Sequence, residues 1–234
     1  YLDNYTVLMK ASVANTQAKE LLSIQELNTK LESELFWFSG LKWKNENEFW
    51  LNDGKKFYRY NIVTESGSLL HELVETAENS TFHDASENVA YTIENNVYIN
   101  SGDGSKITVT DNSDKNIVSG QAIARSEFGI TNGLFWSPDG SSIAYYQKDE
   151  SAVHDYPLLD NSKTPGELKS IKYPMAGQTS EKSKVGIYNV ARGTTVYITP
   201  KGNPEDYLTN VSWGPNEEFI YIAEVNRDQN HMQL

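Results

Sequence analysis

The sequence predicts an all-β fold, organised as a partial β-propeller of about four four-stranded blades. Apolar residues make up 38% of the 234 positions, and 14 Tyr and 5 Trp favour many short strands over a few long helices. A hairpin that starts at an aromatic residue recurs along the chain, and a second, alternating hairpin follows it. Four strands per repeat is the pattern of a propeller blade, whereas a β-sandwich shares only the short, regularly spaced strands.

The first two blades are predicted over residues 1–36 and 37–77. In the second of them, Trp43 precedes a polar Asn-Glu-Asn-Glu turn and the apolar run Phe49–Leu51. Alternating aromatic residues then lead through a turn at Gly67 to a last strand. Polar, glycine-containing turns between such runs predict sequential antiparallel strands.

The third blade is predicted over residues 78–118. Phe82 marks its first strand, and a polar turn separates Phe82 from the run Val89–Ile93. The second hairpin turns at Gly102–Gly104 and ends in the run Ile107–Thr110. Short runs rich in β-branched and aromatic residues, bounded by such turns, are typical of strands.

The fourth blade is predicted over residues 130–200, and an incomplete fifth over residues 208–234. Trp136 and Trp213 mark their first strands, and a proline-containing turn follows each tryptophan. In the fourth blade this turn is the Pro-Asp-Gly sequence at residues 138–140. Such a turn joins neighbouring antiparallel strands, so each tryptophan is expected to open a hairpin.

Two insertions explain the uneven spacing of the aromatic markers. Residues 119–129 are rich in Ala, Gln, Arg and Glu and end in Gly129, which predicts a short helix of two turns at most. Residues 149–184 show no sustained period. Their Tyr, Leu, Ile, Met and Pro content predicts an ordered, extended arm that packs on another surface.

Composition excludes several classes of function. The formal net charge is -12, with 32 acidic against 20 basic side chains, which argues against nucleic-acid binding. The absence of cysteine excludes disulfides, a thiolate nucleophile and a cysteine-based zinc site. No apolar run is long enough to span a bilayer, and the first residues do not resemble a signal peptide.

The sequence also lacks the residue patterns of a catalytic centre. It contains no Gly-x-Ser-x-Gly elbow and no Ser, Asp and His set in a strand-to-helix context. We therefore expect no catalytic residue in this chain. The four histidines stand far apart, so we predict neither a metal site nor a cofactor; they are His71, His83, His154 and His231.

Four motifs in a fixed order carry a resemblance to a known family. They are Glu127–Ile130 followed by Phe135–Gly140, then Ile143–Ser151, Tyr173–Gly177 and Asn226–Asn230. Together they resemble the N-terminal propeller region of the dipeptidyl peptidase IV family, which belongs to the prolyl oligopeptidase superfamily. The resemblance is strongest from Phe82 to Leu234.

The resemblance implies an eight-bladed propeller and a C-terminal α/β-hydrolase domain that is absent from this chain. In the family, two glutamates on a short helical insertion bind the free amino terminus of a peptide substrate. Glu127 matches one of them, whereas Ser126 stands where the second is expected. The alternative for Glu127 is an ordinary exposed carboxylate at a helix end. No residue matches the substrate-binding arginine of the family, and Arg59 is interpreted as a solvent-facing strand residue.

The resemblance also implies a homodimer to which the arm contributes. Hydrophobic and aromatic side chains are its expected anchors, in line with the composition of interface cores; they are Val153, Tyr156, Leu158, Leu159 and Tyr173. The alternative is that these side chains pack against their own blade.

The resulting functional hypothesis concerns a longer parent protein. This chain would gate peptide substrates and anchor their amino terminus for a serine exopeptidase that releases short N-terminal units. The family further implies export to the periplasm or the outside of the cell. The alternative is a noncatalytic propeller that binds other proteins. A Gly-x-Ser-x-Gly elbow followed by Asp and His further along the same gene would favour the exopeptidase.

Overall fold

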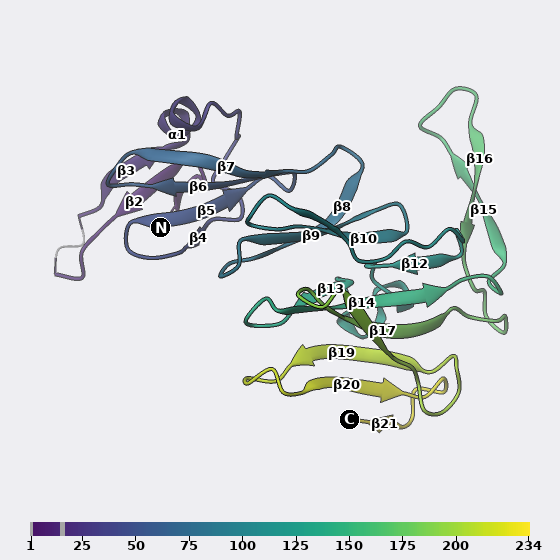
Figure 1. Cartoon of the computed structure of the whole chain (residues 1–234). Helices are drawn as coiled ribbons and strands as arrows, with labels where there is room; N and C mark the ends of the chain where they lie inside the picture. The colour runs from purple at the N-terminus through teal and green to yellow at the C-terminus, as the bar shows by residue number, and fades with distance from the viewer. Residues whose placement is uncertain (1, 15–16) are drawn as a thin grey trace. The chain divides into compact units, whose positions relative to one another are not determined.

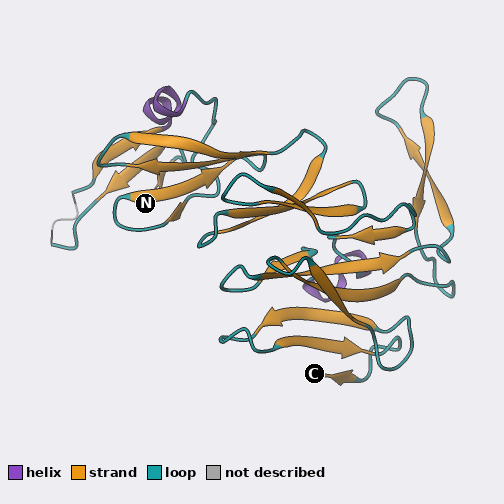
Figure 2. Cartoon of the chain, viewed as in Figure 1, coloured by secondary structure: helices purple, strands orange, loops and turns teal. Residues whose placement is uncertain are grey.

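The computed structural model describes residues 2–14 and 17–234, and the predicted all-β class is confirmed (Figure 2). Antiparallel sheets dominate, and the described residues contain one α-helix and one 3-10 helix. Neither kind of helix found there is both long and apolar enough to cross a membrane. The chain divides into two compact units, one comprising residues up to Ser80 with Gly102–Ser105, the other Thr81–Ser101 with Lys106–Leu234.

The described residues of the first unit form two antiparallel sheets (Figure 1). One has the order β1-β2-β3 and consists of β1 (Leu2–Asp3), β2 (Val7–Lys10) and β3 (Lys19–Ser23). The other is a four-stranded meander of β4 (Lys42–Trp43), β5 (Glu48–Asn52), β6 (Lys56–Asn61) and β7 (Ser66–Glu72). These four strands fall within the predicted second blade, residues 37–77.

Helix α1 (Ile24–Leu31) follows β3 directly in the first unit. Ser23 caps it, because the Glu26 N–H donates to Ser23 Oγ at 3.3 Å and the Ser23 N–H donates to Glu26 Oε2 at 2.9 Å. Ile24 and Leu27 are buried in the core of the unit. Over its described residues, the predicted first blade therefore contains three strands and a helix.

The second unit contains three sheets and a separate hairpin. The chain enters it along β8 (Ala77–His83), which forms a sheet with β9 (Asn88–Ile93), β10 (Asn96–Asn100) and β11 (Lys106–Thr108). The middle sheet comprises β12 (Ile117–Ser119), β13 (Leu134–Trp136), β14 (Ser142–Asp149), β17 (Lys182–Asn189) and β18 (Thr194–Ile198). The last comprises β19 (Tyr207–Trp213), β20 (Ile220–Val225) and β21 (Met232–Gln233).

The middle sheet has a hydrophobic core on each face, as strand β14 shows. Successive side chains of a strand point to opposite faces. Ile143 and Tyr145 pack in one cluster with residues of β9 and β10. Ala144 and Tyr146 pack in another with residues of β19 and β20. The three sheets therefore stack in chain order, as consecutive propeller blades do.

The tryptophans that mark the repeat make equivalent hydrogen bonds. Trp136 Nε1 donates to the carbonyl oxygen of Thr81 at 3.2 Å, and Trp213 Nε1 donates to that of Phe135 at 3.0 Å. Each acceptor directly precedes an aromatic marker of the preceding sheet, Phe82 or Trp136. The repeated aromatic residue thus links one sheet to the one before it.

The predicted arm, residues 149–184, contains an antiparallel hairpin (Figure 1). Its strands are β15 (Asp155–Asp160) and β16 (Glu167–Lys172), paired from Asp155 opposite Lys172 to Asp160 opposite Glu167. Within the described residues these two strands pair only with each other. An isolated two-stranded hairpin is marginally stable in water, and most residues of these two strands are exposed.

Candidate functional site

A loop leaves the middle sheet from the edge of β14. Both β12 and β13 pair with β14 on this edge, β12 towards its end and β13 towards its start. The Gly120 N–H donates to the carbonyl oxygen of Tyr146 at 2.7 Å, and the Tyr146 N–H donates to that of Gly133 at 3.0 Å. The loop 121–132 therefore starts and ends at one residue of β14, as an Ω-loop does.

Glycine is required at both ends of this loop. A Cβ atom on Gly133 would lie 2.4 Å from the carbonyl carbon of Gln121 and 2.5 Å from that of Gly120. Gly120 has a φ of +77°, a backbone conformation that residues with a Cβ atom rarely adopt. A Cβ atom on Gly120 would also lie 2.6 Å from the side-chain Cγ2 of Thr92. The close approach of the two ends thus has a steric cause.

The 3-10 helix η1 (Ala124–Gly129) occupies the loop. On either side of it, Ile123 and Ile130 are buried in the cluster shared by the middle and last sheets. Between these anchors, Glu127 and Phe128 are exposed. The loop therefore holds its two ends in the core and presents the predicted binding residue at the surface.

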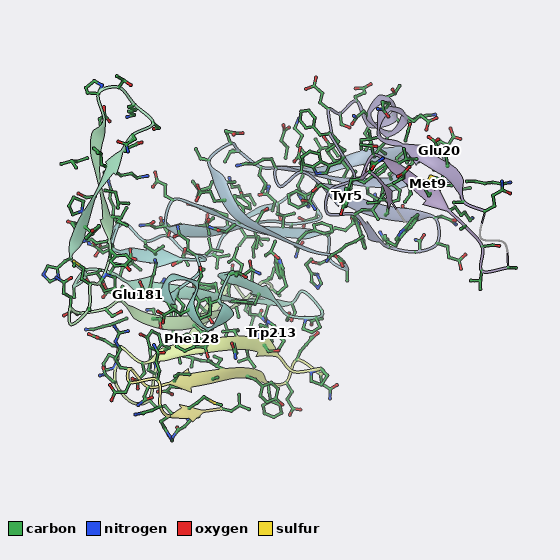
Figure 3. All side chains as sticks on the ribbon, turned by 180° about the vertical axis from the view of Figure 1, so that it is seen from behind. Tyr5, Met9, Glu20, Phe128, Glu181 and Trp213 are labelled. Carbon is green, nitrogen blue, oxygen red and sulfur yellow. The ribbon has the colours of Figure 1, made fainter. Side chains whose placement is uncertain are left out.

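Several backbone conformations in η1 require support from other segments. The φ angles of Ala124, Ser126 and Phe128 are +52°, +66° and +56°, in the left-handed region that non-glycine residues rarely adopt. The Ala124 N–H donates to Glu181 Oε1 at 2.9 Å, which fixes the start of η1. The Phe128 ring lies 5.0 Å from the ring of Tyr207, which fixes its end. Figure 3 labels Phe128 and Glu181 on the second unit.

A cavity of about 140 Å³ adjoins η1 within the second unit. Glu127 and Glu181 both line it, and aromatic and basic side chains complete its wall, among them Tyr173, Tyr207 and Arg227. Its wall thus comes from the loop, from the chain that returns from the arm, and from the last sheet, including the turn between β20 and β21.

Arg227 is oriented by contacts other than the two glutamates. Its Nη1 donates to the Tyr207 hydroxyl, and its Cζ lies 5.2 Å from the centre of the Tyr207 ring. Its backbone N–H donates to Asp206 Oδ1 at 2.9 Å. Within the described residues, no ion pair joins Arg227 to a carboxylate. Gln229 Nε2 donates a long hydrogen bond of 3.5 Å to Glu127 Oε2.

Two carboxylates and one guanidinium give the cavity wall a net negative charge. Carboxylates form charge-assisted hydrogen bonds with ammonium groups, and aromatic rings also attract cations. The small volume admits a compact group. The arrangement therefore suits a small, positively charged end of a ligand.

Sequence reasoning identified one of the three charged residues of this wall. Glu127 is on η1, and the neighbouring Ser126 is exposed beside it. Glu181 and Arg227 were not predicted as binding residues. Arg227 belongs to the motif Asn226–Asn230, so the family resemblance could have indicated it as a site residue. Glu181 lies far from Glu127 in the sequence and belongs to none of the motifs. In the first unit, Arg59 lies 3.9 Å from a carboxylate oxygen of Glu48.

Four of the five predicted dimer anchors are exposed and lie on or next to the hairpin β15–β16; they are Tyr156, Leu158, Leu159 and Tyr173. Leu159 is the most exposed of them, at 61%. Val153 differs, because it is 3% exposed and therefore packed within its own chain. The rings of Tyr156 and Tyr173 lie 5.8 Å apart, so the base of the arm is connected to the wall of the cavity.

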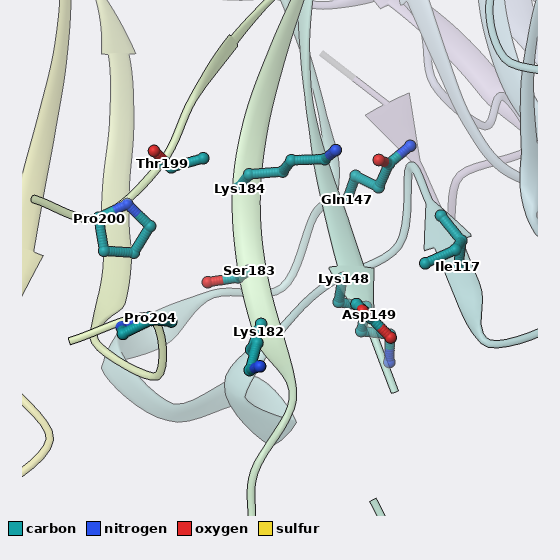
Figure 4. Close-up of a pocket in the computed structure, with 10 residues that line it drawn as sticks. All are labelled: Ile117, Gln147, Lys148, Asp149, Lys182, Ser183, Lys184, Thr199, Pro200 and Pro204. Carbon is teal, nitrogen blue, oxygen red and sulfur yellow. The ribbon is translucent and has the colours of Figure 1, made fainter. Parts of the chain in front are cut away.

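A second cavity of about 390 Å³ lies where β14 ends and β17 begins (Figure 4). Lys182, Lys184 and Asp149 line it, together with prolines of the segment 199–204. Hydrogen bonds from the Ser151 hydroxyl and N–H lower the pKa of Asp149, and the two lysines lower it further. None of the predicted binding residues lines this cavity.

Comparison with protein families gives a match over most of the chain. Residues 41–234 match the model of the dipeptidyl peptidase IV (DPP IV) N-terminal region. Dipeptidyl aminopeptidase B of Saccharomyces cerevisiae is 27% identical over 176 residues, which cover 70% of this chain and 22% of that protein. The chain thus spans about a fifth of the length of this curated relative.

Solved structures give the same result for the fold. A candidate dipeptidyl aminopeptidase IV from Bacteroides ovatus matches with a TM-score of 0.83 and 38% identity, over 97% of this chain and 32% of that one. Dipeptidyl peptidase 4 of Porphyromonas gingivalis matches with a TM-score of 0.73 and 23% identity, over 97% of this chain and 34% of that one.

Proposed function

The chain belongs to the dipeptidyl peptidase IV N-terminal region family, and on this basis we propose that it positions peptide substrates for a serine exopeptidase. In this proposal, an α/β-hydrolase domain elsewhere in the same protein supplies the catalytic serine. The β-sheet region described here admits peptides and holds their free amino terminus, so that short N-terminal units are released. The names of the relatives, which are dipeptidyl aminopeptidases, support a peptidase as the parent protein.

The observation that carries the proposal is the placement of Glu127. Its loop is closed at the neck by two glycines, and Glu127 lines a cavity with net negative charge. A carboxylate at a cavity wall can accept charge-assisted hydrogen bonds from an ammonium group. A fixed contact with the chain end also sets the distance from that end to the scissile bond, which is how positioning promotes a reaction.

Replacing Glu127 by Gln tests this role in the full-length protein. We expect kcat/KM for peptides with a free amino terminus to fall by about a hundredfold, because the charge is lost while the size of the side chain is kept. The matched control is Glu218→Gln, since Glu218 is exposed in the same unit and does not line the cavity. Equal kcat/KM values for Glu127→Gln and wild type would rule the role out.

One observation favours a second candidate function, a noncatalytic propeller that binds proteins. Ser126 stands where the family resemblance implies a second glutamate, so the site departs from the pattern of a peptide-trimming enzyme. The sequence of the whole gene distinguishes the two functions. A Gly-x-Ser-x-Gly elbow with Asp and His after it supports the peptidase, and its absence supports the binding module.

We also propose that the parent protein is a homodimer and that the hairpin β15–β16 contributes to its interface. Replacing residues 155–172 by a short glycine linker should weaken dimerisation, because it removes the exposed apolar side chains of the arm. Sedimentation velocity of the full-length protein measures the effect. A profile identical to that of wild type would argue against the proposal.

The family resemblance further leads us to propose export of the parent protein to the periplasm or the outside of the cell. Fractionation of the native cells, with detection of the full-length protein in each fraction, tests this localisation.

A further inference from the structure

Glu181 places a second carboxylate at the cavity that holds Glu127. It directly precedes β17, whereas Glu127 belongs to η1, so the two come from segments that are far apart in the sequence. Ser180 beside it is buried, and the strand that begins at Lys182 is paired along its whole length with β14. The backbone of Glu181 is therefore held by a central strand of the middle sheet.

One oxygen of the Glu181 carboxylate is occupied and the other faces no protein donor. Oε1 accepts the Ala124 N–H at 2.9 Å. In the described part of the chain, Glu181 forms no ion pair, and Oε2 has no hydrogen-bond partner. The bond to Ala124 orients the carboxylate of a residue that lines the cavity, and it leaves Oε2 able to accept a hydrogen bond.

We propose that Glu181 is the second acidic residue that binds the positively charged end of the ligand, and that it and Glu127 together set the preference for a free amino terminus. The inference rests on the proposed function of Glu127. An ammonium group carries three N–H donors, so carboxylates on two different segments can each accept one of them. A carboxylate oriented by a rigid strand loses little freedom on binding.

Ser126 therefore does not leave the site with a single acidic residue. The two carboxylates lie on separate segments, and the loop 121–132 links them through the bond from Ala124 to Glu181. A shift of η1 would move Glu127 relative to Glu181. Glu181 thus supplies one carboxylate, and its bond to Ala124 helps to position the other, that of Glu127.

The test measures a ligand preference in the full-length protein. A peptide with a free amino terminus and the same peptide acetylated at that end are compared as competitive ligands. Glu181→Gln keeps an oxygen that accepts from the Ala124 N–H and removes only the charge. We expect the preference for the free amine to fall about tenfold, with an unchanged Tm. Glu218→Gln, the matched control, should keep the preference of wild type.

The outcomes separate this inference from the proposed function. If Glu127→Gln lowers the preference and Glu181→Gln does not, Glu181 is only a support of η1 and the inference is overturned. If neither variant lowers it, the proposed function fails as well. A purely structural role also predicts that Glu181→Ala weakens both peptides equally while Glu181→Gln behaves as wild type, and this result would again overturn the inference.

Discussion

The turn 137–141 and the loop 121–132 both adjoin strand β14, and they are held by different kinds of contact. In the turn, Asp139 Oδ1 accepts the Ser137 hydroxyl at 2.7 Å and the Ser141 N–H at 2.8 Å. These bonds join residues at most two positions apart, and His83 Nε2, which lies 3.0 Å from the Pro138 carbonyl oxygen, adds one distant contact. In the loop, the decisive contacts come from Glu181 and Tyr207, which are distant in the sequence.

The difference bears on function. The side chain of Asp139 fixes the turn mainly through bonds to Ser137 and Ser141, and no binding residue is proposed there. The loop has left-handed backbone at three non-glycine residues and depends on its surroundings. The residues that support the loop, Glu181 and Tyr207, line the same cavity as Glu127. Binding sites are commonly built from loops that a rigid scaffold positions.

The largest expected effect comes from closing the neck of the loop. Gly133→Ala places a Cβ within 2.5 Å of backbone atoms of Gly120 and Gln121, which have no flexible end to move. We expect the free energy of unfolding to fall by about 2 to 3 kcal/mol, as for other overpacked sites. Urea denaturation of the full-length protein measures this loss.

Gly166→Ala is the matched control, because the nearest atoms to its added Cβ are 3.3 Å away and it lies at the hairpin of the arm. Its loss of stability should be much smaller. Similar losses for the two variants would mean that the neck of the loop is not tightly packed.

A smaller effect on stability, with an effect on binding, is expected for Phe128→Ala. Its ring contacts Tyr207 and is partly exposed, so removing it should cost about 1 kcal/mol or less. Because this contact fixes the end of η1, the affinity for a peptide with a free amino terminus should fall about fivefold. An unchanged affinity, measured by titration calorimetry, would show that the contact with Tyr207 does not position η1 for binding.

The same contrast explains what could be predicted from the sequence. The turns after Phe82, Trp136 and Trp213 follow from local residue types, and the structure has strands on both sides of each. Glu127 was found because a motif surrounds it. Glu181 and Tyr207 reach the cavity only through the pairing of β17 and β19 with their neighbours, and no local pattern records that.

Helix α1 is a different case, because its signal is local. Ser23 and Glu26 form a capping box, and Ile24 and Leu27 lie on the buried side of the helix. The expectation of a fourth strand in the first blade left no place for a helix. The interpretation of residues 1–36 as a four-stranded blade followed the repeat pattern and did not use the local capping-box signal.

The smallest expected effect concerns the turn and is a dependence on pH. Slight burial opposes ionisation of Asp139, but hydrogen bonds from Ser141, Ser137 and the Glu217 side chain outweigh it and lower its pKa from the ordinary 3.8 to about 2. A lowered pKa in the folded state stabilises the protein above the unfolded-state pKa, and this stability is lost as the pH falls from about 4 to about 2. Solvent screens this exposed carboxylate, so the contribution is less than about 1 kcal/mol.

Asp139→Asn keeps an oxygen that accepts the same two hydrogen bonds and removes the charge. Wild type should therefore be slightly more stable than the variant at pH 6, and the difference should vanish towards pH 2, as measured by urea denaturation across that range. If the difference stays constant with pH, the bonds to Asp139 act through geometry alone. The stability of the turn would then come from the backbone pairing of β13 and β14, and the loop 121–132 also ends at this pair of strands. The turn and the loop would then differ only in the contacts that η1 makes with Glu181 and Tyr207.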